Sequence, residues 1–95
     1  MNIIVAIHVL DQAGYQTYRE KMTPILQRFG GFFAFDFAVD HTFKAPVEHA
    51  VNRLFSIQFP DRTTMDKFFS DSNYLDVRKA HFESSVGGVT ILRTS

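Results

Sequence analysis

Apolar residues change their spacing along this chain in a way that separates strands from helices. Residues 2–10 are almost continuously apolar and rich in Ile and Val, which predicts a strand buried on both faces. After Asp11, whose carboxylate can cap a helix, apolar residues recur every three or four positions up to Gly30-Gly31 and predict a helix. Pro24 lies within that stretch and is expected to kink or divide the helix.

Two later segments alternate with a period of two, which predicts two further strands. Residues 40–50 between them contain Pro46 and charges of both signs, and they are expected to form a long hairpin connection. The three apolar rows expected to lie under the helices are Ile3/Val5/Ile7/Val9, Phe33/Phe35/Phe37 and Phe55/Ile57/Phe59.

The C-terminal part of the chain gives a second set of helix and strand signals. Asp61 follows the third strand and is expected to cap a helix, which residues 70–73 interrupt before a second helical piece. Gly87-Gly88 are expected to precede a short last strand over residues 89–92.

The element order is strand, helix, strand, strand, helix, strand, which predicts an α+β fold of the ferredoxin-like type. In this fold, the helices cover one face of a four-stranded antiparallel sheet. Residues 1–95 are expected to form a single domain, since nothing in the sequence reads as a linker or an internal repeat.

The sheet face away from the helices is expected to carry both apolar and polar residues. Its apolar members are Ile4, Ala6, Leu10, Phe32, Ala34 and Leu54, and its polar ones are His8, Asp36, Ser56 and Gln58. Exposing the large apolar side chains would forgo about 1.5–3 kcal/mol each. We therefore expect this face to pack on a second copy of the chain, giving a homodimer.

Composition narrows the classes of function. The formal net charge is zero and the basic residues are dispersed, so a nucleic-acid partner is not expected. The absence of Cys excludes disulfides, thiolate metal sites and a Cys nucleophile. Neither a signal peptide nor a membrane-spanning run is evident, so no membrane partner is expected and the predicted location is cytoplasmic. The 11 Phe indicate a thick core or an apolar surface that meets a partner.

Several short motifs placed on these elements resemble those of one family. They are Phe29-Gly30-Gly31, Arg53-Leu54, Phe59-Pro60-Asp61-Arg62, and Phe68-Phe69-Ser70-Asp71-Ser72-Asn73-Tyr74 followed by Arg78. Together they resemble the domain-of-unknown-function 1330 family of the dimeric α/β-barrel superfamily. The resemblance implies a ferredoxin-like protomer, a sheet-to-sheet dimer and a ligand cleft between helices and sheet. The superfamily includes cofactor-independent monooxygenases, haem-degrading enzymes, isomerases and stress-response barrels, whereas the family itself has no assigned function.

The chain departs from the pattern of this family at two places. Residues 40–50 are unlike the acidic, glycine-containing hairpin usual in the family, and Phe68 or Phe69 stands where relatives commonly have Trp. Both changes would reshape a pocket, so the substrate of a relative would not transfer directly to this chain.

Three residues are weak candidates for catalysis. His8 lies in an otherwise apolar strand. It is either a general base at a cavity mouth or an interfacial imidazole with a hydrogen-bond partner. Tyr18 lies on a helix face turned to the sheet, where its hydroxyl either meets a ligand or is bonded within the core. Arg53 either clamps a ligand carboxylate or pairs with a nearby acid, for which Asp36, Asp40 and Glu48 are available.

Ligand-binding candidates come from the inward rows and the second helical region. They are Phe35, Phe55, Tyr74 and Arg78. The alternative for Tyr74 is a core residue with a bonded hydroxyl, and for Arg78 a solvated or interface charge. No metal site is predicted, because the four His lack the helical spacing that metal ligands require. No cofactor is predicted either, and a haem role would need His81 or His49 as axial ligand.

Two functions from different classes fit these features. The first is a small-molecule binding protein or cofactor-independent enzyme, with an apolar cleft in each protomer. The alternative is a non-catalytic homodimeric structural or regulatory module whose aromatics are core. A solvent-reaching cavity of a few hundred cubic ångström would favour the first.

Overall fold

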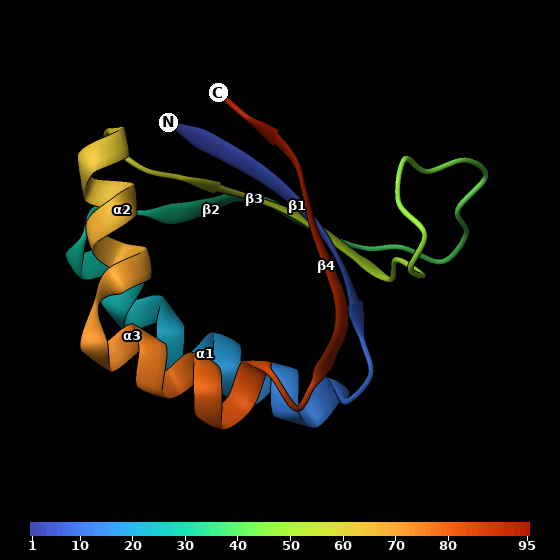
Figure 1. Ribbon diagram of the computed structural model, residues 1–95, viewed down its shortest axis with the longest axis horizontal. Coiled ribbons are helices and arrows are strands. Elements are labelled where there is room, and N and C mark those ends of the chain that lie inside the picture. The colour runs from blue at the N-terminus through green and yellow to red at the C-terminus, as the bar shows by residue number, and fades with distance from the viewer.

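The computed structural model describes residues 1–95 as an antiparallel four-stranded sheet with strand order β2-β3-β1-β4 and helices on one face (Figure 1). Each inner strand pairs antiparallel with its neighbours, as the ferredoxin-like order requires. The elements are β1 (Asn2–Val9), α1 (Gln12–Arg28), β2 (Phe32–Ala38), β3 (Arg53–Gln58), α2 (Arg62–Ser70), α3 (Ser72–Val77), a π-helical turn η1 (Arg78–Phe82) and β4 (Val86–Thr94).

Aspartate side chains begin all three α-helices. The carboxylate of Asp11 accepts a hydrogen bond from the Gly14 N–H at 3.1 Å, and that of Asp61 accepts one from the Thr64 N–H at 2.7 Å. Asp71 caps α3 in the same way. These contacts satisfy N–H groups that have no partner within the helix. The caps predicted at Asp11 and Asp61 are therefore confirmed.

The end of α1 is set by two glycines. Gly30 has φ +75°, and the N–H groups of Gly30 and Gly31 donate to the carbonyls of Gln27 and Leu26. This is a Schellman turn, in which glycine avoids the steric cost of the left-handed conformation. Pro24 lies inside α1 and does not divide it. Its ring is on the exposed side, where water can replace the donor it lacks.

A bulge in β2 changes which residues of that strand face the helices. Phe33 lies opposite Ile57, but Phe35 lies opposite Ser56, so Ala34 and Phe35 together oppose a single residue of β3. Directly opposed residues in an antiparallel pair point to the same face. Phe33 therefore faces the helices while Phe35 faces away from them.

Beyond the bulge, each residue of β2 lies on the opposite face of the sheet from the one predicted. Asp36 lies opposite Phe55, on the helix side, and Phe37 lies opposite Leu54, on the outer side. The predictions that Phe35 and Phe37 lie under the helices, and that Asp36 lies on the outer face, are therefore wrong. The physical reason is the ion pairing of Asp36 on the helix side, described below.

Strand β4 is longer than predicted and contains Gly87 and Gly88, so the prediction that the strand starts after them is wrong. A Cβ at Gly88 would lie 2.5 Å from Cγ of His49. The absence of a side chain thus lets the His49 ring pack on the strand, where its Nε2 shares a hydrogen bond of 2.8 Å with the Thr90 hydroxyl. This contact fixes one end of the long β2–β3 connection.

The core lies between the sheet and the helices. Ile7, Leu26 and Phe68 are completely buried there. The remaining buried members come from β1, α1, β3, α2 and α3, together with Phe59, which directly follows β3. The rows predicted to face inward on β1 and β3 are confirmed. No helix is both long and apolar enough to cross a membrane.

Candidate functional site

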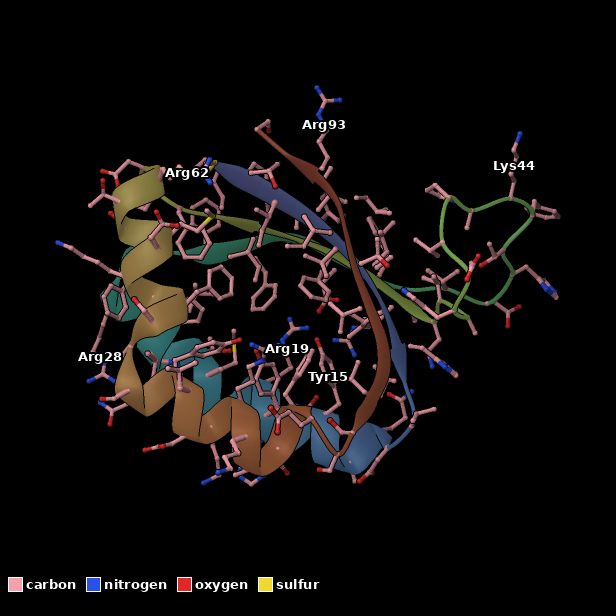
Figure 2. The ribbon with its side chains drawn as sticks, in the orientation of Figure 1. Tyr15, Arg19, Arg28, Lys44, Arg62 and Arg93 are labelled. Carbon is pink, nitrogen blue, oxygen red and sulfur yellow. The ribbon has the colours of Figure 1, made fainter.

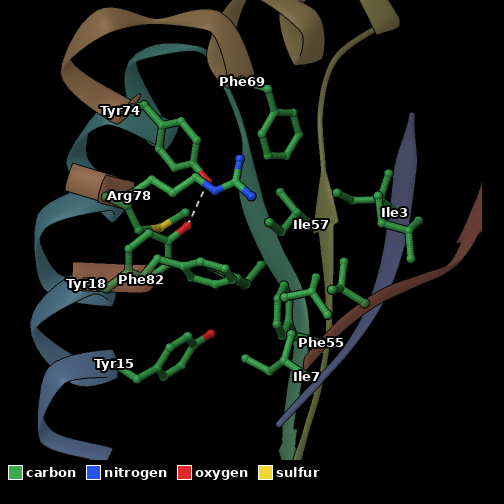
Figure 3. A pocket seen from close by; sticks show the side chains of 15 residues that line it. Ile3, Ile7, Tyr15, Tyr18, Phe55, Ile57, Phe69, Tyr74, Arg78 and Phe82 are labelled. Atoms are coloured by element: carbon green, nitrogen blue, oxygen red, sulfur yellow. Dashed lines mark hydrogen bonds between the residues drawn. The ribbon is translucent and has the colours of Figure 1, made fainter. Parts of the chain in front are cut away.

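A cavity of about 330 Å³ lies between the helices and the concave face of the sheet. Of its 15 lining residues, Arg78 alone carries a charge (Figure 3). The others are Ile3, Val5, Ile7, Tyr15, Tyr18, Met22, Phe33, Phe55, Ile57, Phe69, Tyr74, Phe82, Val89 and Ile91. Such walls favour an apolar or aromatic occupant.

The cavity opens towards β4, which is an edge strand. Val89 and Ile91 lie opposite Ile7 and Val5 and so point to the helix side, yet their exposed fractions are 47% and 57%. Ile7 and Val5 on the neighbouring strand are buried. Helices cover β1 and β3 but leave this edge free, so the cavity is exposed to solvent along β4.

Two tyrosine hydroxyls meet in the wall of the cavity. The hydroxyl oxygens of Tyr18 on α1 and Tyr74 on α3 are 2.9 Å apart and hydrogen-bonded (Figure 3). Burial, together with the neighbouring Tyr74 hydroxyl, raises the pKa of Tyr18 far above its ordinary value, and burial also raises the pKa of Tyr74. Both groups therefore remain protonated across the physiological pH range and serve as hydrogen-bond donors.

A charged network borders the cavity at its Tyr15 end. Both Arg53 Nε and Nη2 donate to the two carboxylate oxygens of Asp36, at 2.7 and 2.8 Å. Arg19 Nη2 donates to the same carboxylate at 2.8 Å, and Arg19 Nη1 donates to the Tyr15 hydroxyl at 3.1 Å. The Arg19 guanidinium also stacks 3.7 Å from the ring centre of Phe33. Figure 2 shows Tyr15 and Arg19 pointing from α1 towards the sheet.

The network fixes the charge of Asp36. Partial burial by itself would raise the pKa of this carboxyl, but hydrogen bonds from Arg53 and Arg19 and their positive charges hold it below its usual value. The hydrogen bonds to Asp36 correspondingly raise the pKa of Arg53. Asp36 is therefore ionised at neutral pH and occupies both arginines.

Arg78 differs from these two arginines because it has no acidic partner. It forms no ion pair or side-chain hydrogen bond within the chain, and its guanidinium carbon lies 5.6 Å from the ring centre of Phe82. Figure 3 shows its side chain extending from η1 towards the Tyr18–Tyr74 pair. Its positive charge lowers the pKa of both tyrosines slightly against the effect of burial. The residue is exposed, so it stands at the edge of the cavity.

A second groove of about 430 Å³ lies on the opposite side of the sheet. The long connection between β2 and β3 forms one wall, and Ala6, Leu54 and Leu92 form the sheet side. Phe43, in the same connection, is 99% exposed. Aromatic surface is therefore present on both sides of the sheet, but it is enclosed only under the helices.

Comparison with known proteins places the chain in a family. The family model described as "Domain of unknown function (DUF1330)" matches residues 2–94. The chain belongs to the DUF1330 family. This confirms the resemblance drawn from its motifs, whereas a search of the curated proteins gives no match.

Solved structures show that this DUF1330 member has a ferredoxin-like fold. RPA0582, a protein of unknown function from Rhodopseudomonas palustris, has a TM-score of 0.84 at 14% identity, covering 98% of this chain and 78% of its own. At3g17210 from Arabidopsis thaliana has a TM-score of 0.64 at 8% identity, with 99% and 95% covered. SnoaB, a cofactor-independent oxygenase from Streptomyces nogalater, has a TM-score of 0.55 at 13% identity, and the match covers 99% of this chain and 91% of SnoaB. At these identities the likeness concerns the fold alone.

The structure brings together four of the residues predicted for a site in this DUF1330 member. These are Tyr18, Phe55, Tyr74 and Arg78, all of which line the cavity. Phe35 does not, because the bulge turns it to the outer face, where its ring centre lies 5.5 Å from that of Phe37.

The other two catalytic candidates also lie outside the cavity wall. Arg53 is bound to Asp36, which matches the ion-pair interpretation of its role. His8 pairs with Gly88 across β1 and β4 and is half-buried on the outer face. Neither His49 nor His81 lines the cavity, and no group of three or more His, Asp or Glu side chains is placed to hold a metal ion.

Sequence reasoning missed Arg19, and it placed Asp36, one of the acids available to pair with Arg53, on the wrong face of the sheet. Arg19 falls four residues after Tyr15, on the apolar stripe of α1, and a charge on such a stripe is a signal that a buried partner exists. The partner, Asp36, was assigned to the wrong face because a bulge leaves no mark in a period-two pattern.

Proposed function

We propose that this DUF1330 protein binds a small apolar or aromatic molecule in the cavity between its helices and its sheet. The observation that supports this most is the cavity itself, about 330 Å³ in volume and open at β4. Ligand sites are typically concave spaces of about 300–1,000 Å³ with apolar walls and a few polar groups. Here the polar groups are the Tyr18–Tyr74 pair, Arg78 and the Tyr15 hydroxyl.

A thermal-shift screen of the purified protein against aromatic metabolites and common cofactors tests the proposal. A ligand present at a hundred times its dissociation constant adds about 2.7 kcal/mol to the free energy of unfolding. In a domain of this size, that raises the melting temperature by roughly 10 °C or more. Absence of any stabilising compound in a broad aromatic library would count against binding.

A pair of tryptophan substitutions on β4 tests whether binding occurs in this cavity. Ile91 is exposed at the opening, so Ile91→Trp should obstruct the cavity with little effect on folding. Its neighbour Leu92 lines the groove on the other face, which makes Leu92→Trp the matched control. A ligand found in the screen should bind Ile91→Trp at least about tenfold more weakly than the wild type, and it should bind Leu92→Trp with wild-type affinity. Equal affinity in both variants would place the ligand elsewhere.

A reaction without a bound cofactor is the enzymatic form of the same proposal. SnoaB, which shares the fold, is a cofactor-independent oxygenase, and Tyr18 and Tyr74 here offer protonated hydroxyls inside the cavity. Each hit from the screen should be incubated with the protein in air and followed by chromatography. Loss of compound that Ile91→Trp suppresses would indicate an enzyme, and unchanged compound would leave a binding protein.

The proposal includes pairing with a second copy through the outer face of the sheet. Phe32 and Phe37 on this face, both in β2, are 52% and 57% exposed. Covering such side chains is favourable by about 25 cal/mol per Å². Light scattering at micromolar concentration should give twice the mass of the chain, and a monomeric mass would overturn this part.

A non-catalytic homodimeric structural or regulatory module is the second candidate function. The exposed aromatic outer face favours it, because that face provides contact area without any need for the cavity. A dimer in solution that no compound stabilises would support this alternative over ligand binding.

A further inference from the structure

The charges around the cavity are unevenly paired. Arg19 and Arg53 both contact the carboxylate of Asp36 at 2.7–2.8 Å, so both guanidiniums are held by an acid within the chain. Arg78 is the one charged residue in the cavity wall, and it contacts no carboxylate. An arginine that is exposed at the mouth costs little in the empty protein, because water solvates its guanidinium.

The tyrosine pair near Arg78 also has unused hydrogen-bonding capacity. Two hydroxyl groups carry two hydrogens, and the bond between Tyr18 and Tyr74 consumes one of them. The other hydrogen has no acceptor within the chain. Because both groups stay protonated, that hydrogen is available to an acceptor oxygen of a ligand. Figure 3 shows these hydroxyls and the Arg78 guanidinium grouped at one side of the cavity.

We infer that the ligand is a mono-anion, an aromatic or apolar carboxylic acid whose carboxylate is bound by Arg78 at the cavity mouth and by a hydroxyl of the Tyr18–Tyr74 pair. This inference rests on the proposed function, since it specifies the class of molecule that enters the same cavity. The apolar walls take the hydrocarbon part of the ligand. A planar guanidinium matches a carboxylate with two parallel hydrogen bonds, and it binds more strongly when both are partly removed from water.

The number of free cations limits the charge of the ligand. Arg78 is the one cation in the cavity wall and balances one negative charge, whereas the Arg19–Asp36–Arg53 network keeps a net charge of +1 but lies outside the wall. A dianion such as a phosphate monoester would therefore keep excess charge against walls formed by 14 apolar or aromatic side chains. A neutral ligand would displace water from the Arg78 guanidinium without providing a negative charge to pair with it. The carboxylate is thus the group that satisfies both Arg78 and the free hydroxyl hydrogen.

Calorimetric titration with 2-naphthoate and its neutral counterpart 2-naphthamide tests the inference. The two probes have nearly the same shape and differ in charge. The wild-type protein should bind the acid at least about tenfold more tightly than the amide, as one charge-assisted hydrogen bond implies. Arg78→Gln should remove this preference, and Arg78→Lys should restore part of it. Lys79→Gln removes the same charge from the adjacent exposed residue and should leave the preference unchanged.

The outcomes separate this inference from the function on which it rests. Equal binding of acid and amide, or a preference that survives Arg78→Gln, overturns the mono-anion inference and leaves the apolar cavity as the binding site. Failure of both probes, and of a matched pair with one ring, to bind at millimolar concentration overturns the inference together with the proposed function. A melting curve of each variant confirms that it is folded, which is expected because Arg78 is exposed.

Discussion

The two faces of the sheet use the same kind of residue for different purposes. Under the helices, Phe33 and Phe55 pack edge to face, with ring centres 5.6 Å apart, in the wall of the cavity. On the outer face, Phe35 and Phe37 stack with ring centres 5.5 Å apart, and Phe37 is 57% exposed. The difference teaches that the composition of an aromatic-rich strand does not predict which of its rings face the helices and which face outward. The register of the strand places one ring in the cavity wall and the next on the outer surface.

The largest expected difference between the faces is in the free energy of unfolding. Phe55 is 6% exposed, so Phe55→Ala should lower that free energy by about 3 kcal/mol through lost burial and a larger cavity. Phe37→Ala should lower it by less than about 1 kcal/mol in the monomer, because over half of that side chain is already exposed. Urea denaturation at low protein concentration measures both. A large, concentration-dependent loss in Phe37→Ala would instead show that the outer face is buried in a dimer.

The second effect concerns the ion pairs that hold β2 in register. Asp36→Asn should lower the free energy of unfolding by about 2 kcal/mol, because Arg19 and Arg53 would lose their counter-ion while partly buried. Asp40→Asn removes the same charge from a side chain that is 99% exposed and should change stability by less than about 0.5 kcal/mol. Similar losses in the two variants, measured by urea denaturation, would contradict a structural role for the network.

A third and smaller effect should come from the tyrosine pair. Tyr18→Phe should lower the free energy of unfolding by about 1 kcal/mol, since it leaves the Tyr74 hydroxyl buried without its partner. Adding Tyr74→Phe should cost less than the sum of the two single changes, because the double variant has no unpaired hydroxyl. Thermal melts of all four proteins give the coupling. Strict additivity would mean that the two hydroxyls do not depend on each other.

The smallest expected effect is the dependence of stability on pH. The folded-state pKa of Asp36 lies below its unfolded value, so its contribution to stability is present above the unfolded pKa and is lost as pH falls through the folded one. The loss should begin below about pH 5 and continue towards strongly acidic pH. Stability curves of the wild type and Asp36→Asn should converge over that range. Curves that stay parallel would show that another carboxyl controls acid unfolding.

Signals that depend on near neighbours in the sequence predicted most of the fold. Asp11 and Asp61 cap helices because the carboxylate of an N-cap residue reaches the N–H three residues later. Gly30 ends α1 because its left-handed turn is formed by hydrogen bonds to the last turn of the same helix. The element order followed from these boundaries. The predicted single domain, homodimer and cytoplasmic location remain predictions.

The parts that sequence could not supply depend on contacts between distant residues. The face of Asp36 is decided by two arginines 17 positions away along the chain on either side. Gly88 lies within β4 and pairs with His8, and the ring of His49 occupies the space that a side chain at Gly88 would need, which no local pattern records. The regular period of a helix or strand predicts which of its residues share a face, and this placed four cavity residues correctly: Tyr18, Phe55, Tyr74 and Arg78. Phe35 failed because a bulge reverses that periodicity.

The bulge in β2 also bears on how this chain can change length in evolution. Ala34 and Phe35 share one partner on β3, so deleting Ala34 would produce a regular strand in which Phe33 and Asp36 still point to the helices and Phe37 still points outward. A one-residue gap inside a strand normally reverses the faces of everything beyond it. In this family such a gap at position 34 would preserve the cavity, the ion pairs and the outer aromatic stack. Homologues with and without that residue can therefore keep the same side chains on each face of the sheet.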